Sequence, residues 1–476
     1  MGNYKYLLKN VGLLTLSSFA TKLLSFFLVP LYTNILTTTD YGTYDLFNNT
    51  VVVLLPILTL NIQDAVLRFS MDDEYDDDAV ITIAYRYLFF SNLIVIVGLV
   101  LNNIFSINLI LKQYAIYFFL MFLTQSLSGV ITYYIRGIGE ILELSISSLL
   151  ASAITVVCNI LFLVIFDWGL TGYFLANLLG PLYQCIYLIL RTKLVHSIKI
   201  HVNFNKEKKQ MLDYCTPLIA NSIAWWVNNT SDRYIVIFFC GLADNGIYAV
   251  SSKIPSILNM FQTIFGQAWS LSAVHDFDKD DKNGFFSNTY KVYNCILVII
   301  CSIIIVFDKV FAKILYAKEF YIAWKYVPWL TIAIVFGALS GYIGGVFSAV
   351  KDSKIFAHSS IIGAITNIML NIIFTPIIGA LGAAIATMIC YFEVWILRYV
   401  HSKKFIRIKV NLVRDCISYF LLVIQSIILL LLNETIMLYG TEIILLCIII
   451  AMYFGDIVNI LIKIKNNVFE GKRGTR

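Results

Sequence analysis

The chain has 476 residues, of which 59% are hydrophobic and only 13% charged, with a net charge of +6 and a mean hydropathy of +0.81. Soluble domains are about 45–50% apolar and about 25% charged, so this composition excludes a water-soluble enzyme of this size. Apolar runs throughout and an aromatic content of 15% also exclude a disordered chain. Because these runs are continuous rather than alternating, they favour an all-α polytopic membrane protein over a transmembrane β-barrel.

A helix needs about 20 mostly apolar residues to cross a bilayer. At that length the sequence predicts about fourteen transmembrane helices, or thirteen if 355–398, with Pro376 in its middle, forms one broken unit. The first is expected to be a retained helix, because no signal-peptide cleavage site follows it. In chain order the predicted spans are 11–32, 44–66, 80–105, 113–135, 144–166, 170–191, 212–239, 245–267, 289–308, 326–350, 355–376, 378–398, 415–433 and 440–462.

Lys and Arg residues are distributed unevenly between the two sides of this predicted topology. If the N-terminus is cytoplasmic, 26 of the 35 basic residues lie on the cytoplasmic side and five on the other. Cytoplasmic connections of membrane proteins carry such an excess of positive charge. We therefore expect fourteen spans with the N- and C-termini both in the cytoplasm.

Short motifs recur at a nearly constant offset. Asp40-Tyr-Gly-Thr-Tyr44 is echoed by Asp244-Asn-Gly-Ile-Tyr248, and Gly169-Leu-Thr-Gly172 by Gly379-Ala-Leu-Gly382. Two six-helix halves joined in the same orientation form a parallel repeat. The predicted domains are a six-helix bundle over 1–191, a basic cytoplasmic linker over 192–211, a second six-helix bundle over 212–398, and two additional helices with a cytoplasmic tail over 399–476.

Polar side chains share a face in the first two predicted spans. Thr15, Ser18, Lys22 and Ser25 follow helical spacing, and Lys22 lies near the middle of its span. A charge at that depth is costly unless it faces a cavity or a partner, so we expect Lys22 to line a cavity.

The second span carries a comparable polar face. It is formed by Asn61, Asp64 and Arg68, and the spacing of the last two permits an i,i+4 ion pair. Such a pair is an alternative to a direct role for Asp64 or Arg68 in binding. Arg68 also lies near enough to the span's end to extend to the cytoplasmic headgroups.

The seventh and eighth spans repeat this arrangement. Asn221, Trp225, Asn228 and Asp232 share a face of the seventh, with Arg233 alongside. Since these spans correspond to the first two under the repeat, we expect both pairs to face one central cleft, unless Asp232 and Arg233 simply lie at the outer interface. On the eighth span the aligned residues are Lys253, Ser256, Met260, Thr263 and Gln267.

Another polar stripe is better explained by helix packing. Small hydroxyl and amide side chains hydrogen-bond between neighbouring helices in membranes. We therefore expect the stripe on the fifth span to join helices rather than to bind a ligand. It consists of Ser148, Ser152, Thr155 and Asn159.

The sequence lacks the residue patterns that several classes of protein require. The nine cysteines are scattered singly, with no CxxC motif and no metal-ligand spacing to histidine, so no disulfide framework or metal site is expected. The sequence has neither a phosphate-binding P-loop motif nor an HExxH motif. No connection is long enough for a catalytic domain. We predict that the protein is not an enzyme and needs no cofactor.

Two segments resemble bacterial polysaccharide-biosynthesis flippases. One is Leu14–Lys22 running into Pro30-Leu-Tyr-Thr-Asn34 and the Asp40 motif, and the other is Asp232-Arg-Tyr234 continuing through Gly246-Ile-Tyr248 to Lys253. These flippases belong to the multidrug/oligosaccharidyl-lipid/polysaccharide exporter superfamily. The resemblance covers essentially the whole chain.

The resemblance implies a V-shaped pair of six-helix bundles that works by alternating access in the bacterial cytoplasmic (inner) membrane. The implied substrate is an undecaprenyl-diphosphate-linked oligosaccharide, the repeat unit of O-antigen, capsule or a similar glycan. Membrane lipids, a polysaccharide polymerase and a chain-length regulator are the other expected partners, and no nucleic acid is expected. The residues expected to bind substrate are Lys22, Arg233, Lys253, Asn228 and Arg68.

Two carboxylates are candidates for coupling transport to an ion. Asp64 and Asp232 are expected to carry a coupling H⁺ or Na⁺, unless they only pair with the neighbouring arginines. A cation-coupled drug exporter or a lipid II flippase of the same superfamily is the alternative function. An integral-membrane glycosyltransferase or polymerase would need an outward catalytic loop, and a scaffold for polysaccharide assembly would not need a cationic cleft.

Overall fold

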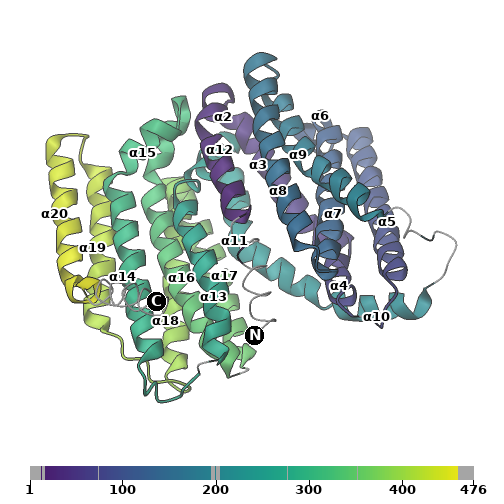
Figure 1. Ribbon diagram of the computed structural model, residues 1–476. Coiled ribbons are helices and arrows are strands. Elements are labelled where there is room, and N and C mark those ends of the chain that lie inside the picture. The colour runs from purple at the N-terminus through teal and green to yellow at the C-terminus, as the bar shows by residue number, and fades with distance from the viewer. Residues whose placement is uncertain are drawn as a thin grey trace, which may run out of the picture. The chain divides into compact units, whose positions relative to one another are not determined.

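All regular elements in the part of the chain that the structure describes are helices (Figure 1). The structure is a computed structural model, and it describes residues 12, 17–72, 74–194, 199, 204–275, 277–350 and 352–458. The chain divides into two compact units, Met1–Tyr234 and Ile235–Arg476. The predicted domain boundaries at 191, 211 and 398 stay predictions.

The first unit is arranged around α7, which contacts α3, α4, α5, α8 and α9. Its apolar interior is formed by side chains such as Phe122, Phe174 and Ile131, which are fully buried. The helices of this unit are residues 17–27, α2 (Val29–Ile35), α3 (Thr38–Leu58), α4 (Ile62–Phe69), α5 (Asp77–Phe105), α6 (Leu109–Gln113), α7 (Ala115–Gly137), α8 (Ile141–Asn159) with its π-helical continuation η1 (Ile160–Ile165), α9 (Gly169–Thr192), α10 (Asn205–Cys215) and most of α11 (Leu218–Cys240).

The second unit is arranged around α16, which contacts α13, α14, α17, α18 and α19. This helix has 83% of its most apolar stretch buried, against 22% for α17, so α16 is central and α17 peripheral. The helices are α12 (Leu242–Ser251), α13 (Pro255–His275), α14 (Phe285–Val306), α15 (Asp308–Leu315), the 3₁₀ helix η3 (Lys318–Lys325), α16 (Val327–Ala349), α17 (Ser353–Ile378), α18 (Ala380–Ser402), α19 (Leu412–Leu431) and α20 (Ile436–Met452).

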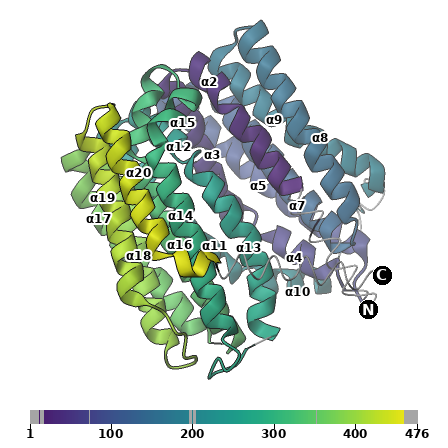
Figure 2. The same ribbon diagram turned by 60° about the vertical axis from the view of Figure 1, so that its left-hand side comes forward.

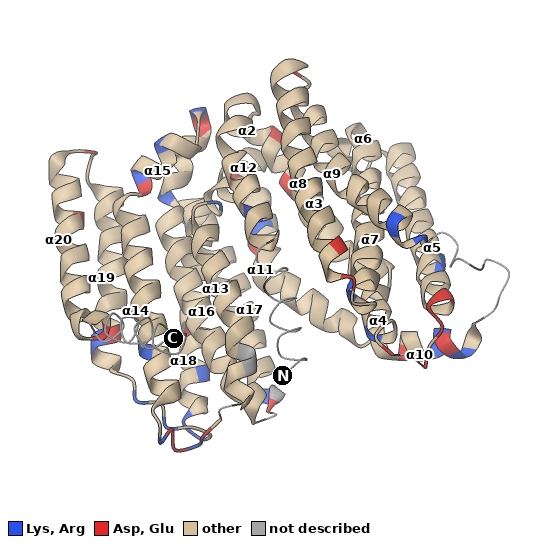
Figure 3. Ribbon diagram, viewed as in Figure 1, with Lys and Arg blue, Asp and Glu red and all other residues tan. Residues whose placement is uncertain are grey.

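The protein is a multi-pass helical membrane protein. Nine helices in the described ranges are long and apolar enough to cross a bilayer, or ten when the bent pair α3–α4 counts as one span. Of the other predicted spans, the first lies partly outside the described residues, α11 and α13 are long but fall short in apolar content, and α20 is apolar but has only 17 residues. Figure 3 shows acidic and basic residues mostly toward helix ends and connections.

The predicted span 44–66 is broken. α3 and α4 meet at a bend of 62°, and Leu60 and Asn61 at the junction have left-handed φ values of 54° and 57°. Asn is one of the few residues that adopts this conformation readily, because its short polar side chain makes local hydrogen bonds. The expectation of one continuous helix here was therefore wrong.

Proline interrupts two further predicted spans. The span 212–239 is divided between α10 and α11 by a turn at Thr216 and Pro217. The span 245–267 is divided between α12 and α13, and α13 begins at Pro255. Proline lacks an N–H donor and disfavours helical backbone at the preceding residue, which explains both breaks.

The segment 355–398 forms two helices rather than one broken unit. α17 continues through Pro376 to Ile378, and α18 begins at Ala380. Gly379 between them has a φ of +67°, a conformation that glycine adopts without the steric penalty of a side chain. Of the two counts expected for this segment, the higher one is correct.

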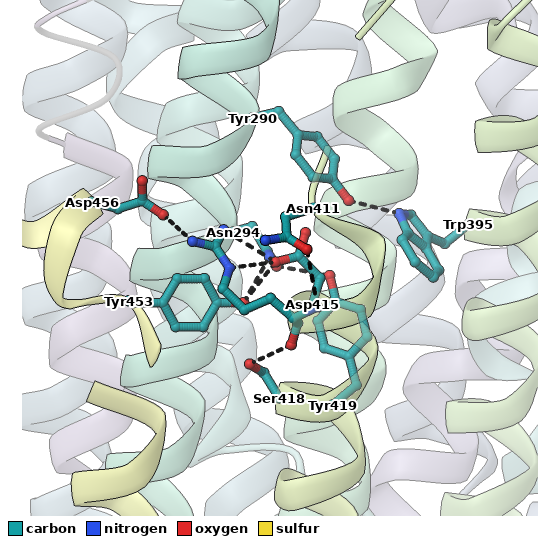
Figure 4. Close-up of polar contacts among 10 residues, drawn as sticks. Tyr290, Asn294, Trp395, Asn411, Asp415, Ser418, Tyr419, Tyr453 and Asp456 are labelled. Atoms are coloured by element: carbon teal, nitrogen blue, oxygen red, sulfur yellow. Dashed lines mark hydrogen bonds and ion pairs between the residues drawn. The ribbon is translucent and has the colours of Figure 1, made fainter. Parts of the chain in front are cut away.

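The last two helices pack on α14 through a buried polar network. α14, α19 and α20 lie side by side in both views (Figures 1 and 2) and contact one another. Asn294 donates to the Tyr453 hydroxyl (3.0 Å) and accepts from Tyr419 (2.9 Å), while Tyr453 donates to Asp415 (3.1 Å; Figure 4). Arg414 pairs with Asp456 and lies over the Tyr453 ring. These hydrogen bonds join the three helices to one another.

We expect Tyr453→Phe to lower the free energy of unfolding by about 1–3 kcal/mol, because the Asn294 amide and the Asp415 carboxylate lose a buried partner. Denaturant unfolding of the detergent-solubilised protein measures this change. Tyr439→Phe is the matched control, since that hydroxyl donates to Glu434 at an exposed position (2.9 Å) and its loss should cost less than about 0.5 kcal/mol. Equal effects of the two variants would contradict a special role for the network.

Candidate functional site

The first unit contains a partly open cavity of about 610 Å³, in which polar side chains lie among a larger apolar lining. It is bounded by the helix 17–27 together with α3, α7, α8 and α9. The residues that line it include Ser17, Ser18, Thr21, Lys22, Ser25, Tyr44, Asn48, Thr124, Gln125, Thr132, Arg136, Ser148, Ser152, Thr155, Asn177 and Gln184.

The charge of this lining is entirely positive. Lys22 and Arg136 are its only charged side chains among the described residues, and no carboxylate belongs to it. The other polar groups are hydroxyls and amides, among them Asn48 and Gln125, which are joined by a hydrogen bond of 3.0 Å. Cations bind phosphate and carboxylate oxygens through charge-assisted hydrogen bonds, while hydroxyls and amides can both donate and accept. The cavity therefore suits an anionic, hydroxyl-rich ligand.

The polar face of the first helix is what brings Lys22 to this cavity. Ser18, Lys22 and Ser25 all line it, as their helical spacing predicts, and Thr15 lies outside the described residues. Ser152 of α8 donates a hydrogen bond to the Thr21 hydroxyl (3.0 Å), which joins the helix 17–27 to α8 at the cavity.

The hydroxyl stripe of α8 has two roles where one was expected. Gln184 of α9 donates to Ser148 at 2.8 Å, which confirms the predicted interhelical bonding. The same stripe also lines the cavity through Ser148, Ser152 and Thr155. These hydroxyls thus both join the helices and line the cavity.

Arg233 forms a partly buried ion pair that the sequence did not indicate. Its guanidinium lies 2.6 Å from both carboxylate oxygens of Asp45 on α3, and the two side chains are only 17% and 14% exposed. Two neighbouring contacts join the same helices, from Tyr234 to Thr50 (2.7 Å) and from Trp226 to the Asn49 carbonyl (3.0 Å). Arg233 therefore holds α11 against α3 within the first unit.

The other predicted residues of α11 do not line the cavity. Asp232 is buried and accepts a hydrogen bond from the Arg233 backbone amide (2.9 Å). Asn228 is half-buried and donates to the Ala224 carbonyl (2.9 Å). Their predicted roles in ion coupling and substrate binding stay predictions.

The ion pair that the spacing of Asp64 and Arg68 permits is not formed. Asp64 instead accepts a hydrogen bond from the Asn61 side chain, across the first turn of α4. Arg68 pairs with Asp72 at 3.4 Å and is 53% exposed. The break before α4 places Asn61 directly before this turn, where its side-chain amide donates to the Asp64 carboxylate.

Lys253 lies in the turn between α12 and α13 and is half-buried, so it does not begin a continuous helical face as expected. The second unit has a cavity of its own, of about 360 Å³. Thr263 is among its lining residues, Lys253 is not, and no charged side chain belongs to the described lining. Trp269 and Tyr342 form its aromatic wall, with ring centroids 4.1 Å apart.

Two residues of the first unit escaped the sequence interpretation. The sequence interpretation treated Arg136 as one of many cytoplasmic charges. Its place at the end of a helix with a polar face could have indicated that it lines the cavity. Asp45 immediately follows the Asp40-Tyr-Gly-Thr-Tyr44 motif, but its partner is 188 residues away. No local pattern indicates such a pairing.

The fold is that of the superfamily expected from the sequence. The chain is similar to the lipid II flippase MurJ in an inward closed conformation, with a TM-score of 0.65 and 14% identity, covering 94% of this chain and 99% of that one. It is also similar to an inward-facing multidrug resistance MATE family transporter of the MOP superfamily, with a TM-score of 0.64 and 13% identity over 82% of this chain and 94% of that one.

The family match defines the protein more closely than the similarity of fold does. Residues 7–271 match the polysaccharide biosynthesis protein family, so the chain belongs to that family and the resemblance is confirmed. A curated relative is the probable low-salt glycan biosynthesis flippase Agl15 of Haloferax volcanii, 22% identical over 209 residues, or 43% of this chain and 44% of that protein. The match thus spans less than half the length of that relative. The chain is thus a multi-pass membrane protein of a polysaccharide biosynthesis family, and its fold is shared with a lipid II flippase and a multidrug transporter.

Proposed function

We propose that the protein translocates undecaprenyl-diphosphate-linked oligosaccharide repeat units from the inner to the outer leaflet of the bacterial cytoplasmic membrane by alternating access. The observation that carries this proposal is the cavity of the first unit, which combines two cations with many hydroxyl and amide groups and has no carboxylate in its described lining. A diphosphate or an acidic sugar needs cationic partners, and the sugar hydroxyls need groups that donate and accept.

Lys22 and Arg136 are the residues we assign to the anionic part of this substrate. The other residues expected to take part are Arg233, Lys253, Asn228 and Arg68 for binding, with Asp64 and Asp232 for ion coupling. The structure favours a smaller contribution from Arg233 and Arg68, because each already forms an ion pair. For these two, binding a substrate requires that the existing pair open.

We also propose that the chain crosses the membrane fourteen times, with both termini in the cytoplasm. The ten candidate spans support this count, together with the segment beginning near residue 11 and the helices α11, α13 and α20. Two parallel six-helix bundles followed by α19 and α20 account for all fourteen. The distribution of basic residues supports the sidedness.

Deletion of the gene, followed by analysis of lipid-linked oligosaccharides and surface polysaccharide, tests the proposed function. We expect undecaprenyl-linked repeat units to accumulate inside the cell while surface glycan is lost, and the accumulated lipid then identifies the substrate. Unchanged surface glycan combined with new sensitivity to cationic drugs would instead indicate a drug exporter of the same fold. Loss of peptidoglycan synthesis would indicate lipid II as the substrate.

A further inference from the structure

Two carboxyl groups of the second unit are completely buried and lack the bonds that normally accompany burial. Glu442 of α20 and Asp308 of α15 are both 0% exposed. Within the described residues, none of their four carboxyl oxygens accepts a hydrogen bond. A buried carboxylate without donors is strongly disfavoured, and an ionisable group inside a membrane usually marks a functional site.

One buried cation lies close to both carboxyl groups. The Lys309 ammonium, on a residue 5% exposed, donates to the Leu432 carbonyl (3.1 Å) and lies 4.4 Å from the centre of the Trp324 ring. Burial lowers the pKa of Lys309, and the nearby carboxyls of Glu434, Asp308 and Glu442 oppose that shift. Among the residues that the structure describes, the cluster thus contains a single buried positive charge for two buried carboxyl groups.

One proton on either carboxyl group would balance the charge of Lys309, and the helix positions favour Glu442 as its site. Asp308 precedes Lys309 directly and stands in the first turn of α15, where the helix dipole favours a negative charge. Glu442 stands in the second turn of α20 and has no such support. If Lys309 balances Asp308, the cluster is neutral only when Glu442 carries a proton.

The surroundings of Glu442 favour a proton over a metal cation. Gln425 of α19 directs its amide nitrogen toward the Glu442 main-chain carbonyl (3.4 Å), while its side-chain oxygen accepts from Ser302 of α14 (2.8 Å). Na⁺ would need several oxygen ligands, and Lys309 would repel it. The other titratable groups of the elements around this cluster are Lys313 on α15, Tyr321 on η3, Glu434 in the α19–α20 connection and Tyr439 on α20.

We propose that Glu442 is the binding site for one exchangeable proton, inside a buried cluster completed by Lys309 and Asp308. Proton release leaves a Glu442 carboxylate that competes with the Leu432 carbonyl for the Lys309 ammonium. Since Leu432 belongs to the connection between α19 and α20, proton binding is linked to the position of that connection. The proposal goes beyond the proposed transport function and does not depend on its substrate.

Infrared spectroscopy of the purified full-length protein tests this proposal directly. A protonated carboxyl group shows a carbonyl band that disappears on ionisation. We expect such a band to titrate between about pH 5 and about pH 9, a range that includes the values documented for buried Glu. Glu442→Gln should abolish it. Glu434→Gln, which changes an exposed carboxylate paired with Lys313, should leave it intact.

Further variants separate this site from its neighbours. Lys309→Gln should move the titration of the band upward by about one pH unit or more, since loss of a cation disfavours the carboxylate. Should Glu442→Gln not purify as a single species, Glu442→Asp must shift the titration instead. The proposal is overturned if the band is absent or pH-independent in the wild type, persists in Glu442→Gln, or is removed by Asp308→Asn alone. A pH response that appears only with added Na⁺ would indicate a metal cation instead and also overturn it.

Discussion

Asp45→Asn is expected to destabilise the protein by about 3 kcal/mol, because it removes the Asp45 counter-charge from the mostly buried Arg233 guanidinium. Breaking a buried ion pair from one side usually costs more than the pair contributes, since the remaining charge has already lost its water. Both oxygens of Asp45 lie 2.6 Å from the same guanidinium nitrogen. Asparagine keeps one oxygen that can accept a hydrogen bond, so the expected loss comes mainly from the missing negative charge. Denaturant unfolding in detergent measures the change.

The control for this prediction is another arginine–aspartate pair of the same unit. Arg68 and Asp72 are 53% and 29% exposed, so Asp72→Asn should cost less than about 1 kcal/mol. A double-mutant cycle of Asp45→Asn with Arg233→Gln should recover part of the loss, because it removes both charges. Additive effects of the two substitutions would show that Asp45 and Arg233 do not depend on each other.

The double variant Lys22→Ala/Arg136→Ala is expected to reduce glycan export at least about 100-fold, and each single variant at least about tenfold. A charge-assisted hydrogen bond contributes about 1.5–3 kcal/mol, and each 1.4 kcal/mol is a factor of ten in binding. Both side chains line the polar cavity. Export by a complemented deletion strain, measured at matched protein levels, or translocation in proteoliposomes reports this loss.

Two variants control for the effect of charge alone. Lys22→Arg should keep most of the activity, since the cation remains in the cavity. Lys112→Ala removes one positive charge from the same unit at an exposed position, where the ammonium donates only to Ser106 (2.9 Å), and it should be nearly silent. Normal export by the double variant would favour a scaffold role over transport.

Patterns that repeat along a helix were readable from the sequence. The apolar runs indicated a helical membrane protein, and the spacing of Ser18, Lys22 and Ser25 indicated the face that lines the cavity. The resemblance of the motifs around Asp40 and Asp232 indicated the family. These features depend either on residues within a few helical turns of one another or on the composition of the whole chain.

Features that depend on residues far apart in the sequence, or on unusual backbone geometry, could not be predicted from the sequence. Asp64 and Arg68 lie in one continuous helix at a spacing that permits a pair, yet the structure pairs Asp64 with Asn61 and Arg68 with Asp72. The left-handed backbone at Leu60 and Asn61, which sets the position of Asn61, has no signal in the apolar pattern. The partner of Arg233 comes from a helix far away in sequence. Glu442 stood in an apolar run as a single acid, and only the packing of α14, α19 and α20 shows how completely it is enclosed.

The network between α14, α19 and α20 also has a consequence for synthesis of the chain. α14 leaves the ribosome more than a hundred residues before α19, yet Asn294 and Ser302 find their partners on Tyr419, Gln425 and Tyr453. Until those helices insert, these amide and hydroxyl groups face lipid, where an unsatisfied polar group is costly. The polar network of the second unit is therefore complete only when α19, α20 and Tyr453 have been made. Nonsense mutations after residue 410 should yield a protein that membrane quality-control proteases recognise, even though both predicted six-helix bundles have been made.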